Sequence, residues 1–300
     1  MTVGRTTVGR TTVERFVVSD GAAGPYGLTV GPDGALWFTL VHAGEVGRLA
    51  ADGSVTRYGL DAPGCAPSVI TAGPDGALWF TRTGDHRIGR ITVDGEARCY
   101  ELPTAGGPYG IAAGPDGALW FTELNADRIG RITVDGEVTE HPLPVSGGYP
   151  SMITAGPDGA LWFTLNQGGA VGRITADGEV ALHPLPTKGA APVGIARAGD
   201  ALWFVEIGAG QIGRITVAGE VTEHPLPDRA ARPHAIAAAP DGRLWFTEWG
   251  AGRIGSLTPD GRYAGHPLPV EGAEPHGITV TPDGAVHAAL EIGEIVRLAP

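Results

Sequence analysis

Short apolar runs separated by glycine-rich polar turns recur along the whole chain with a period of 41 or 42 residues. The clearest example is Gly-Pro-Asp-Gly-Ala-Leu-Trp-Phe-Thr at residues 31–39, where a turn precedes a strongly apolar strand. Related segments begin at Gly73, Gly114, Gly156, Gly199, Pro240 and Pro282. Six copies contain the tryptophan, and His287 takes its place in the seventh. Such a period is typical of a β-propeller with one four-stranded blade per repeat.

Each repeat is predicted to contain four antiparallel strands, A to D, with strand A innermost. In the third copy the strands are residues 109–113, 118–122, 128–133 and 137–142. Tight Asp-Gly turns join A to B and C to D, because glycine supplies the positive φ that short hairpins need. The longer B–C and D–A loops therefore lie together on the other face, where we expect the functional site.

The two ends of the chain are predicted to share one blade. The last repeat ends after its third strand, residues 294–299, whereas residues 13–18 match the strand D pattern and precede the first strand A. We therefore predict one all-β domain over residues 13–300, a seven-bladed propeller whose N-terminal strand completes the C-terminal blade and closes the ring. Residues 2–11 contain the pentad Thr-Val-Gly-Arg-Thr twice, outside the blade pattern, and we expect a disordered extension over residues 1–12.

Composition narrows the class of partner. The formal net charge of -12 at pH 7 argues against nucleic acid or an anionic membrane as a partner. Cys65 and Cys99 lie in different repeats without a CxxC pair, so neither a disulfide framework nor a thiolate metal site is indicated. The sequence has no apolar run long enough for a membrane span and no secretory signal pattern, which predicts a cytoplasmic protein.

Features that recur in most copies are interpreted as parts of the scaffold. The tryptophan at the centre of strand B is expected to pack between neighbouring blades. Four histidines recur in an outer-strand His-Pro-Leu-Pro motif and receive the same interpretation: His141, His183, His224 and His266.

A site that exists once per molecule must depart from the repeat, so positions that differ between copies are the informative ones. The residue after the proline that opens strand A varies most, and in chain order it is Tyr26, Ser68, Tyr109, Ser151, Val193, His234 and His276. These side chains are expected to surround the mouth of the central channel. The seventh copy also has a glutamate before its proline, Glu274.

A second departure lies in the B–C loop of the seventh copy. Three copies have a glutamate just after strand B, namely Glu123, Glu206 and Glu248, whereas Glu291 is displaced by one position. Because side chains alternate along a strand, Glu291 is predicted to point where the others do not. Glu274 and Glu291 would then lie on one face with His276. Two carboxylates suit a hard divalent cation such as Mg²⁺, and a neutral histidine beside it suits a general base.

The blade segments, Arg-Pro-His-Ala-Ile at 232–236, Glu-Pro-His-Gly-Ile at 274–278 and Glu291 together resemble the virginiamycin B lyase (streptogramin B lyase) family. The resemblance covers residues 13–300, and its most specific part is the Glu-Pro-His segment with a glutamate fifteen residues after the histidine. It implies a monomeric, Mg²⁺-dependent lyase that inactivates cyclic depsipeptide antibiotics by eliminative opening of the ring ester.

The resemblance also implies roles for individual residues. His276 would be the general base, Glu274 and Glu291 would hold Mg²⁺, and His234 would contact the substrate. Tyr26 and Tyr109 occupy the same ring of positions, where their side chains are predicted to stack on aromatic groups of the substrate.

Two other functions fit parts of the pattern. A lactonase-like hydrolase propeller also holds a divalent ion at the channel mouth, but its ligands usually come from several blades, whereas the candidates here cluster in the seventh. A non-catalytic propeller that binds a peptide or protein explains the regular blades. It does not explain why His234, His276 and Glu274 depart from the repeat together.

Overall fold

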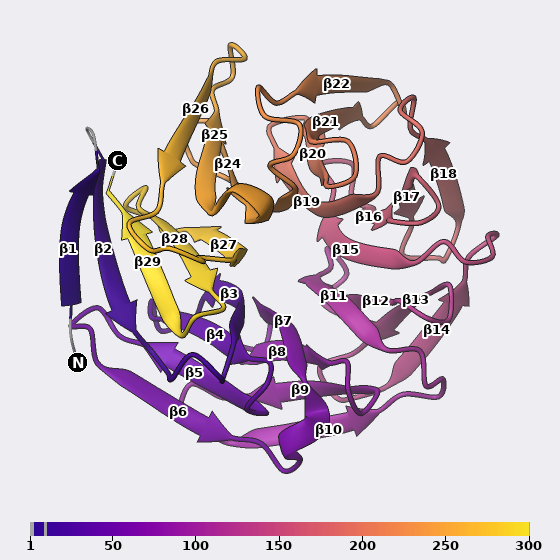
Figure 1. Cartoon of the computed structure of the whole chain (residues 1–300). Helices are drawn as coiled ribbons and strands as arrows, with labels where there is room; N and C mark the ends of the chain where they lie inside the picture. Colours follow the sequence, from indigo (N-terminus) through magenta and orange to yellow (C-terminus); the bar gives the residue numbers. More distant parts are fainter. Residues whose placement is uncertain (1–2, 9–10, 300) are drawn as a thin grey trace.

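A computed structural model of the chain describes residues 3–8 and 11–299. The strands form seven antiparallel sheets, and Figure 1 shows these sheets arranged as blades around a central axis. The prediction of a seven-bladed propeller is therefore confirmed. Two short 3₁₀ helices, η1 (Pro63–Cys65) and η2 (Trp249–Ala251), lie in loops. None of the helices described has the length and hydropathy that a membrane crossing requires.

Six blades contain four strands each, from the centre outwards in chain order. Blades 1 and 2 are β3 (Pro25–Val30), β4 (Leu36–Leu40), β5 (Glu45–Leu49), β6 (Val55–Gly59) and β7 (Pro67–Ala72), β8 (Leu78–Arg82), β9 (Arg87–Ile91), β10 (Ala97–Glu101). Blades 3 and 4 are β11 (Pro108–Ala113), β12 (Leu119–Glu123), β13 (Arg128–Ile132), β14 (Val138–Pro142) and β15 (Pro150–Ala155), β16 (Leu161–Leu165), β17 (Ala170–Ile174), β18 (Val180–Pro184). Blades 5 and 6 are β19 (Pro192–Ala198), β20 (Ala201–Glu206), β21 (Gln211–Thr216), β22 (Val221–Pro225) and β23 (Pro233–Ala238), β24 (Leu244–Glu248), β25 (Arg253–Leu257), β26 (Tyr263–Pro267).

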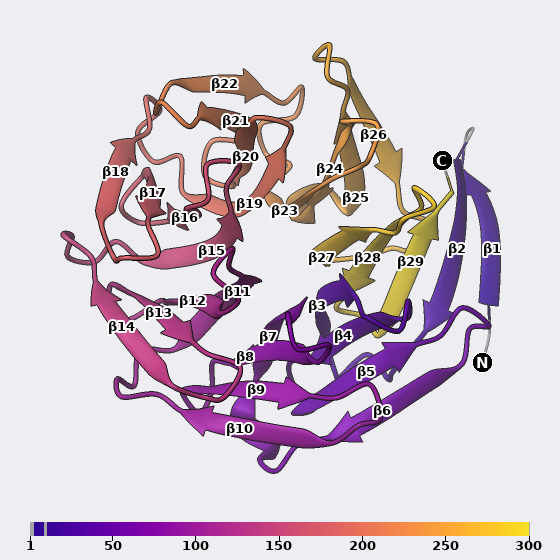
Figure 2. The same cartoon turned by 180° about the vertical axis from the view of Figure 1, so that it is seen from behind.

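Blade 7 is built from both ends of the chain, as the sequence predicted. Its inner strands are β27 (Pro275–Val280), β28 (Val286–Leu290) and β29 (Glu294–Leu298), and β2 (Thr11–Val17) pairs antiparallel with β29. Val13 lies opposite Leu298 in this pairing, and the two strands run side by side in Figures 1 and 2. The ring is therefore closed by backbone hydrogen bonds between segments from opposite ends of the chain.

The N-terminal extension differs from the expectation of disorder. Residues 3–8 form a further strand, β1 (Val3–Val8), which pairs antiparallel with β2 on the outside of blade 7 and gives this sheet five strands. The physical reason is that the outer edge of β2 offers unpaired backbone N–H and C=O groups. Residues 11 and 12 of the predicted extension begin β2, and residues 1, 2, 9 and 10 lie outside the described residues.

The repeated tryptophans and outer-strand aromatic residues form the scaffold that the sequence indicated. Trp162 is fully buried, its indole N–H donates to Asp158 of the A–B turn at 3.0 Å, and its ring stacks on His183. The equivalent pairs at 5.4–5.6 Å between ring centres are Trp37–Tyr58, Trp79–Tyr100, Trp120–His141 and Trp203–His224. Because Trp120 of blade 3 packs with Ile153 of blade 4, the tryptophans do fill the space between blades.

Strand A of every blade contains a β-bulge directly after its opening proline. In blade 7, Pro275 lies opposite Leu290 and Ile278 lies opposite Ala288, so two residues of β27 face one residue of β28. A bulge of this kind changes the direction of the side chains that it contains. The variable position of strand A, which is His276 in blade 7, is one of the two bulged residues.

Candidate active site

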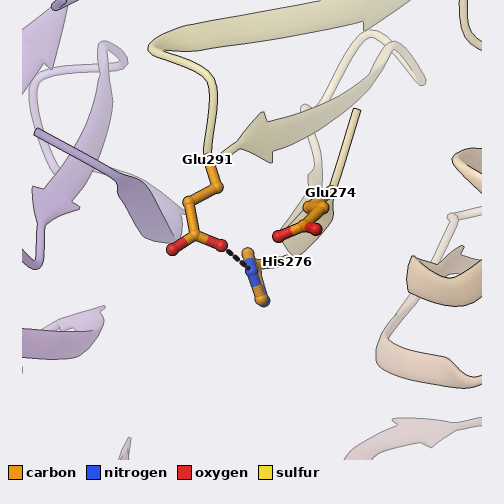
Figure 3. Close-up of side chains that lie close together, drawn as sticks. All are labelled: Glu274, His276 and Glu291. Atoms are coloured by element: carbon orange, nitrogen blue, oxygen red, sulfur yellow. Dashed lines mark hydrogen bonds and ion pairs between the residues drawn. The ribbon is translucent and has the colours of Figure 1, made fainter. Parts of the chain in front are cut away.

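Three side chains of blade 7 converge at the loop face, as Figure 3 shows. Glu274 precedes β27, His276 lies in the bulge of β27, and Glu291 follows the last residue of β28. Nε2 of His276 lies 2.8 Å from Oε2 of Glu291, and one candidate ligand atom from each of the three residues lies within 4.8 Å of the others. The backbone N–H of Glu291 donates to the carbonyl of Glu274 at 3.2 Å, which ties the two loops together.

The backbone of His276 is fixed from both neighbouring blades. Thr247 of β24 donates from Oγ1 to the carbonyl of His276 at 3.0 Å, and the same oxygen accepts the N–H of Ala235 at 2.9 Å. On the other side, a Cβ on Gly277 would collide with the carbonyl oxygen of Tyr26, so glycine lets blades 7 and 1 approach each other. His276 itself is 9% exposed.

Glu291 is held between two histidines from different blades. Its second carboxylate oxygen, Oε1, lies 2.9 Å from Nε2 of His42, which belongs to the B–C loop of blade 1. Burial acts to raise the pKa of Glu291, but the hydrogen bonds from His42 and His276 outweigh burial and lower that pKa. Glu291 is therefore ionised at neutral pH, and since a carboxylate only accepts hydrogen bonds, His276 donates from Nε2.

His42 was missed in the sequence. It breaks the repeat at the second position after strand B, where other copies have Gly84, Asn125 or Gly208. The departure from the repeat is visible in the sequence, but the role of His42 follows only from ring closure, which brings blade 1 beside blade 7. Gly24, with a φ of 63°, lies against the His42 ring, and a Cβ there would be 2.5 Å from it.

The sequence interpretation placed the three other glutamates just after strand B, whereas in the structure each of them ends the strand itself. Glu123, Glu206 and Glu248 are the last residues of β12, β20 and β24, and all three are fully buried. Burial raises the pKa of Glu123 to about 8 and that of Glu206 to about 7. The physical reason is the alternation of side chains: a residue at the strand end faces inward, and only the displaced Glu291 points to the site.

The remaining sequence candidates lie beside His276 at the centre of the ring. Tyr26 packs on the imidazole of His276 at 4.6 Å between ring centres, and His234 meets the same imidazole edge-on at 5.1 Å. The hydroxyls of Tyr26 and Tyr109 are 2.5 Å apart across the axis. The structure thus brings all six predicted site residues together, with Tyr26 as the link between Tyr109 and His276.

The aromatic residues at the centre are uncharged at neutral pH. Burial raises the pKa of both Tyr26 and Tyr109. Burial, followed by the neighbouring His276, lowers the pKa of His234 to about 3, and its Nδ1 atom has no hydrogen-bond partner among the described residues. These three side chains line an axial cavity of about 80 Å³ and offer aromatic surface with polar edges to a ligand above it.

The charged part of the site has the chemistry of a divalent metal centre with an adjacent base. Two carboxylates are available as ligands beside the imidazole of His276, and Glu274 is exposed on the solvent side. Hard cations favour one or two protein carboxylates and keep several waters, which such an open arrangement permits. An ionised Glu291 next to His276 also stabilises the imidazolium that forms when the ring accepts a proton.

The chain matches the virginiamycin B lyase family over residues 11–298. A crystal structure of virginiamycin B lyase from Staphylococcus aureus is 45% identical with a TM-score of 0.93, over 97% of this chain and 99% of that chain. A catalytically inactive histidine-to-alanine variant of that lyase with quinupristin is 44% identical, also with a TM-score of 0.93 and the same coverage. Virginiamycin B lyase from Saccharopolyspora erythraea is 64% identical over 45 residues, and this match spans 15% of each protein. Sequence and fold therefore show that the chain belongs to the virginiamycin B lyase family.

Proposed function

We propose that this protein is a Mg²⁺-dependent carbon–oxygen lyase that linearises type B streptogramin cyclic depsipeptides by eliminative cleavage of the ring ester. The observation that carries the proposal is the cluster of Glu274, His276 and Glu291 beside an aromatic channel mouth. The inactive relative from S. aureus, whose structure contains quinupristin, supports the substrate class.

His276 is proposed as the general base. Since Nε2 donates to Glu291, the other ring nitrogen, Nδ1, is the atom that accepts the proton from the carbon next to a substrate carbonyl while the C–O bond to the neighbouring carbon breaks. The electrons of the C–H bond form the new double bond, and the ester oxygen leaves as a carboxylate. Glu291 orients the ring through the 2.8 Å hydrogen bond and stabilises the protonated imidazole. No water enters the product and no covalent enzyme intermediate is required.

Glu274 and Glu291 are proposed as the protein ligands of Mg²⁺, because these are the carboxylates of the cluster. A bound divalent ion supplies Lewis-acid stabilisation of the negative charge that develops on the substrate carbonyl oxygen during proton removal. Such help is needed, since hydrogen next to a carbonyl is a far weaker acid than imidazolium.

His234, Tyr26 and Tyr109 are proposed to bind the substrate. The neutral imidazole of His234 has an unpartnered nitrogen for a hydrogen bond, and the two tyrosines present aromatic surface to aromatic groups of the ring. Their packing around His276 places these contacts directly beside the proposed base.

The mass of the product tests the reaction. Incubation with a type B streptogramin and Mg²⁺ is expected to give a linear product with the same mass as the substrate, because elimination only rearranges atoms. A product heavier by one water would instead establish hydrolysis, and an unchanged substrate would favour a binding protein. A strong chelator is expected to stop the reaction and added Mg²⁺ to restore it; full activity in the chelator would remove the metal from the proposal.

A further inference from the structure

Blade 7 also departs from the repeat on the opposite face of the disc. His287 of β28 stands where the tryptophan stands in the six other blades. Beside it lies a pocket of about 540 Å³ between blade 7 and blade 1, hereafter the turn-face pocket. Its walls include Phe16, Leu36, Leu49, Asp283, His287 and Arg297. Asp283 belongs to an A–B turn, so this pocket is on the face away from the candidate active site.

The pocket retains the groups that bind an indole ring in blades 1 to 4. In blade 4, Asp158 accepts the indole N–H of Trp162 at 3.0 Å and the Nε–H of Arg173 at 2.7 Å. Blade 7 keeps the aspartate and the arginine as Asp283 and Arg297, which are 3.3 Å apart at Nη2 and Oδ2. The acceptor is therefore present without the indole that uses it elsewhere.

The aromatic partner of the indole is retained as well. In blade 4 the ring of Trp162 stacks on His183, which lies opposite Val171 in the strand pairing. The corresponding position of blade 7 is Phe16, opposite Ile295. Phe16 lines the turn-face pocket, so its aromatic ring faces the pocket at the place where the other blades have a tryptophan ring.

A second substitution accompanies the loss of the tryptophan. A Cβ on Gly156 of blade 4 would collide with the indole of Trp162, and the equivalent residue in blade 7 is Thr281. The hydroxyl of Thr281 donates to Oδ1 of Asp283 at 2.5 Å, at the oxygen to which the indole N–H donates in blades 1 to 4. The Oδ2 atom of Asp283 accepts from Nη2 of Arg297 at 3.3 Å, and its second lone pair is the acceptor for a ligand.

His287 and the local charge restrict the ligand further. His287 is 5% exposed, and its Nδ1 has no hydrogen-bond partner among the described residues. Burial, followed by the charge of Arg297, lowers the pKa of His287 to about 4, so the ring is neutral at pH 7. Glu14 and Asp283 face a single Arg297, with Glu14 3.1 Å from it, which disfavours anionic ligands.

We propose that the turn-face pocket is a second binding site, and that it takes a flat aromatic molecule with an N–H donor, of the indole class. The ring lies against Phe16 with Leu36 and Leu49 as apolar walls, and the N–H donates to Asp283. A volume of about 540 Å³ is in the range of small-molecule sites, which are mostly apolar with a few placed polar groups.

Titration of the protein with indole, followed by calorimetry or ligand-observed NMR, tests the proposal. We expect saturable binding at one site, with indene, which has the same shape but no N–H, at least about tenfold weaker. The His276→Ala variant is expected to bind indole like the wild type, because the two sites lie on opposite faces. Equal binding of indole and indene would overturn the proposal.

Two variants locate the ligand. The double variant Thr281→Gly/His287→Trp restores the residues of blades 1 to 4, so it is expected to fill the pocket and abolish indole binding. Asp283→Asn is expected to weaken binding about tenfold, whereas the matched Asp158→Asn in blade 4 leaves it unchanged. If the double variant does not fold, Phe16→Leu replaces it as the variant that removes the aromatic wall. Wild-type affinity in the folded pocket variants would place the ligand elsewhere.

Discussion

A shift of one position at the end of strand B changes the environment of a glutamate in this propeller. Glu123 ends strand B and is fully buried, whereas Glu291 follows strand B and reaches two histidines. The first carboxyl has a raised pKa and the second a lowered one. The same residue type is therefore a destabilising buried acid in blade 3 and an ionised partner of two histidines in blade 7.

Glu123 is predicted to make the protein less stable as the pH rises. Its pKa is about 8 in the folded state and near 4.5 when unfolded, so between these values only the folded state keeps the proton. The free energy of unfolding should then fall by up to about 1.4 kcal/mol per pH unit, with the full loss reached above pH 8. Glu123→Leu, which copies Leu165 of blade 4, is expected to stabilise the protein by about 2 to 4 kcal/mol at pH 8.

Urea unfolding between pH 5 and 8 measures this effect. The slope against pH should be shallower for Glu123→Leu than for the wild type, while Glu220→Gln, at an exposed glutamate, should keep the wild-type slope. Identical slopes in Glu123→Leu and the wild type would show that Glu123 is ionised in the folded state.

His276→Ala is predicted to lower turnover at least about 10²-fold, the usual contribution of a positioned acid–base group. The side chain touches Glu291 and Tyr26 but is not part of the Trp-stacking scaffold, so the fold should persist by circular dichroism. His224→Ala is the matched control, because His224 stacks on Trp203 in the scaffold and should be dispensable for turnover. A rate near that of the wild type in His276→Ala would exclude His276 as the base.

The six candidate residues could be found in the sequence because each departs from a regular repeat. His234 and His276 replace small or aromatic residues at one register position, and the structure places them 5.1 Å apart. His42 could not be assigned in this way, since its contact with Glu291 joins residues 249 positions apart through ring closure. Side-chain contacts between the first and last blades are invisible to a comparison of copies.

At the scale of elements, the bulge in strand A sets the direction of the His276 side chain. Thr247 of the preceding blade holds the backbone of His276 in place. Thr247→Val removes the hydroxyl that donates to His276 and accepts from Ala235. We expect a loss of about 1 to 2 kcal/mol in the free energy of unfolding and a fall in kcat of about tenfold with little change in KM. Thermal unfolding and steady-state kinetics measure the two effects.

Thr164→Val is the control for this prediction. Thr164 of blade 4 accepts from Met152 and donates to Val193 in the same way, but Val193 is not one of the candidate site residues. Its replacement should cost similar stability and leave kcat unchanged. Equal effects on kcat in the two variants would mean that general loosening of the ring, and not the position of His276, limits turnover.

At the scale of the whole molecule, the period of the tryptophans predicted the number of blades, and the strand patterns at the two chain ends predicted the closure of blade 7. The strand β1 was not predicted, because residues 3–8 do not match the blade pattern and pair only with the edge of β2. Comparison of the repeats detects only features that recur, so an added edge strand gives no periodic signal.

The pairing of β2 with β29, which closes the ring, is predicted to be the main contribution of the two chain ends to the stability of the fold. β2 contributes Val13, which is fully buried in the core of blade 7, and Arg15, whose guanidinium lies 2.5 Å from Glu294. Deletion of residues 1–17 should expose the edge of β29 and leave no monomeric folded protein. Deletion of residues 1–8 removes only β1 and should lower the melting temperature by a few degrees at most.

Size-exclusion chromatography and calorimetry of the two truncations distinguish the loss of ring closure from the loss of a few N-terminal residues.

The candidate site depends on ring closure as well, because His42 of blade 1 and His276 of blade 7 hold Glu291 from the two sides of the junction. A destabilised but folded variant of β2, such as Val13→Ala, should therefore lose turnover at temperatures below its own melting point. If the 1–17 truncation melted like the full chain, the pairing of β2 with β29 would contribute little, and the junction would be held by blades 7 and 1 alone.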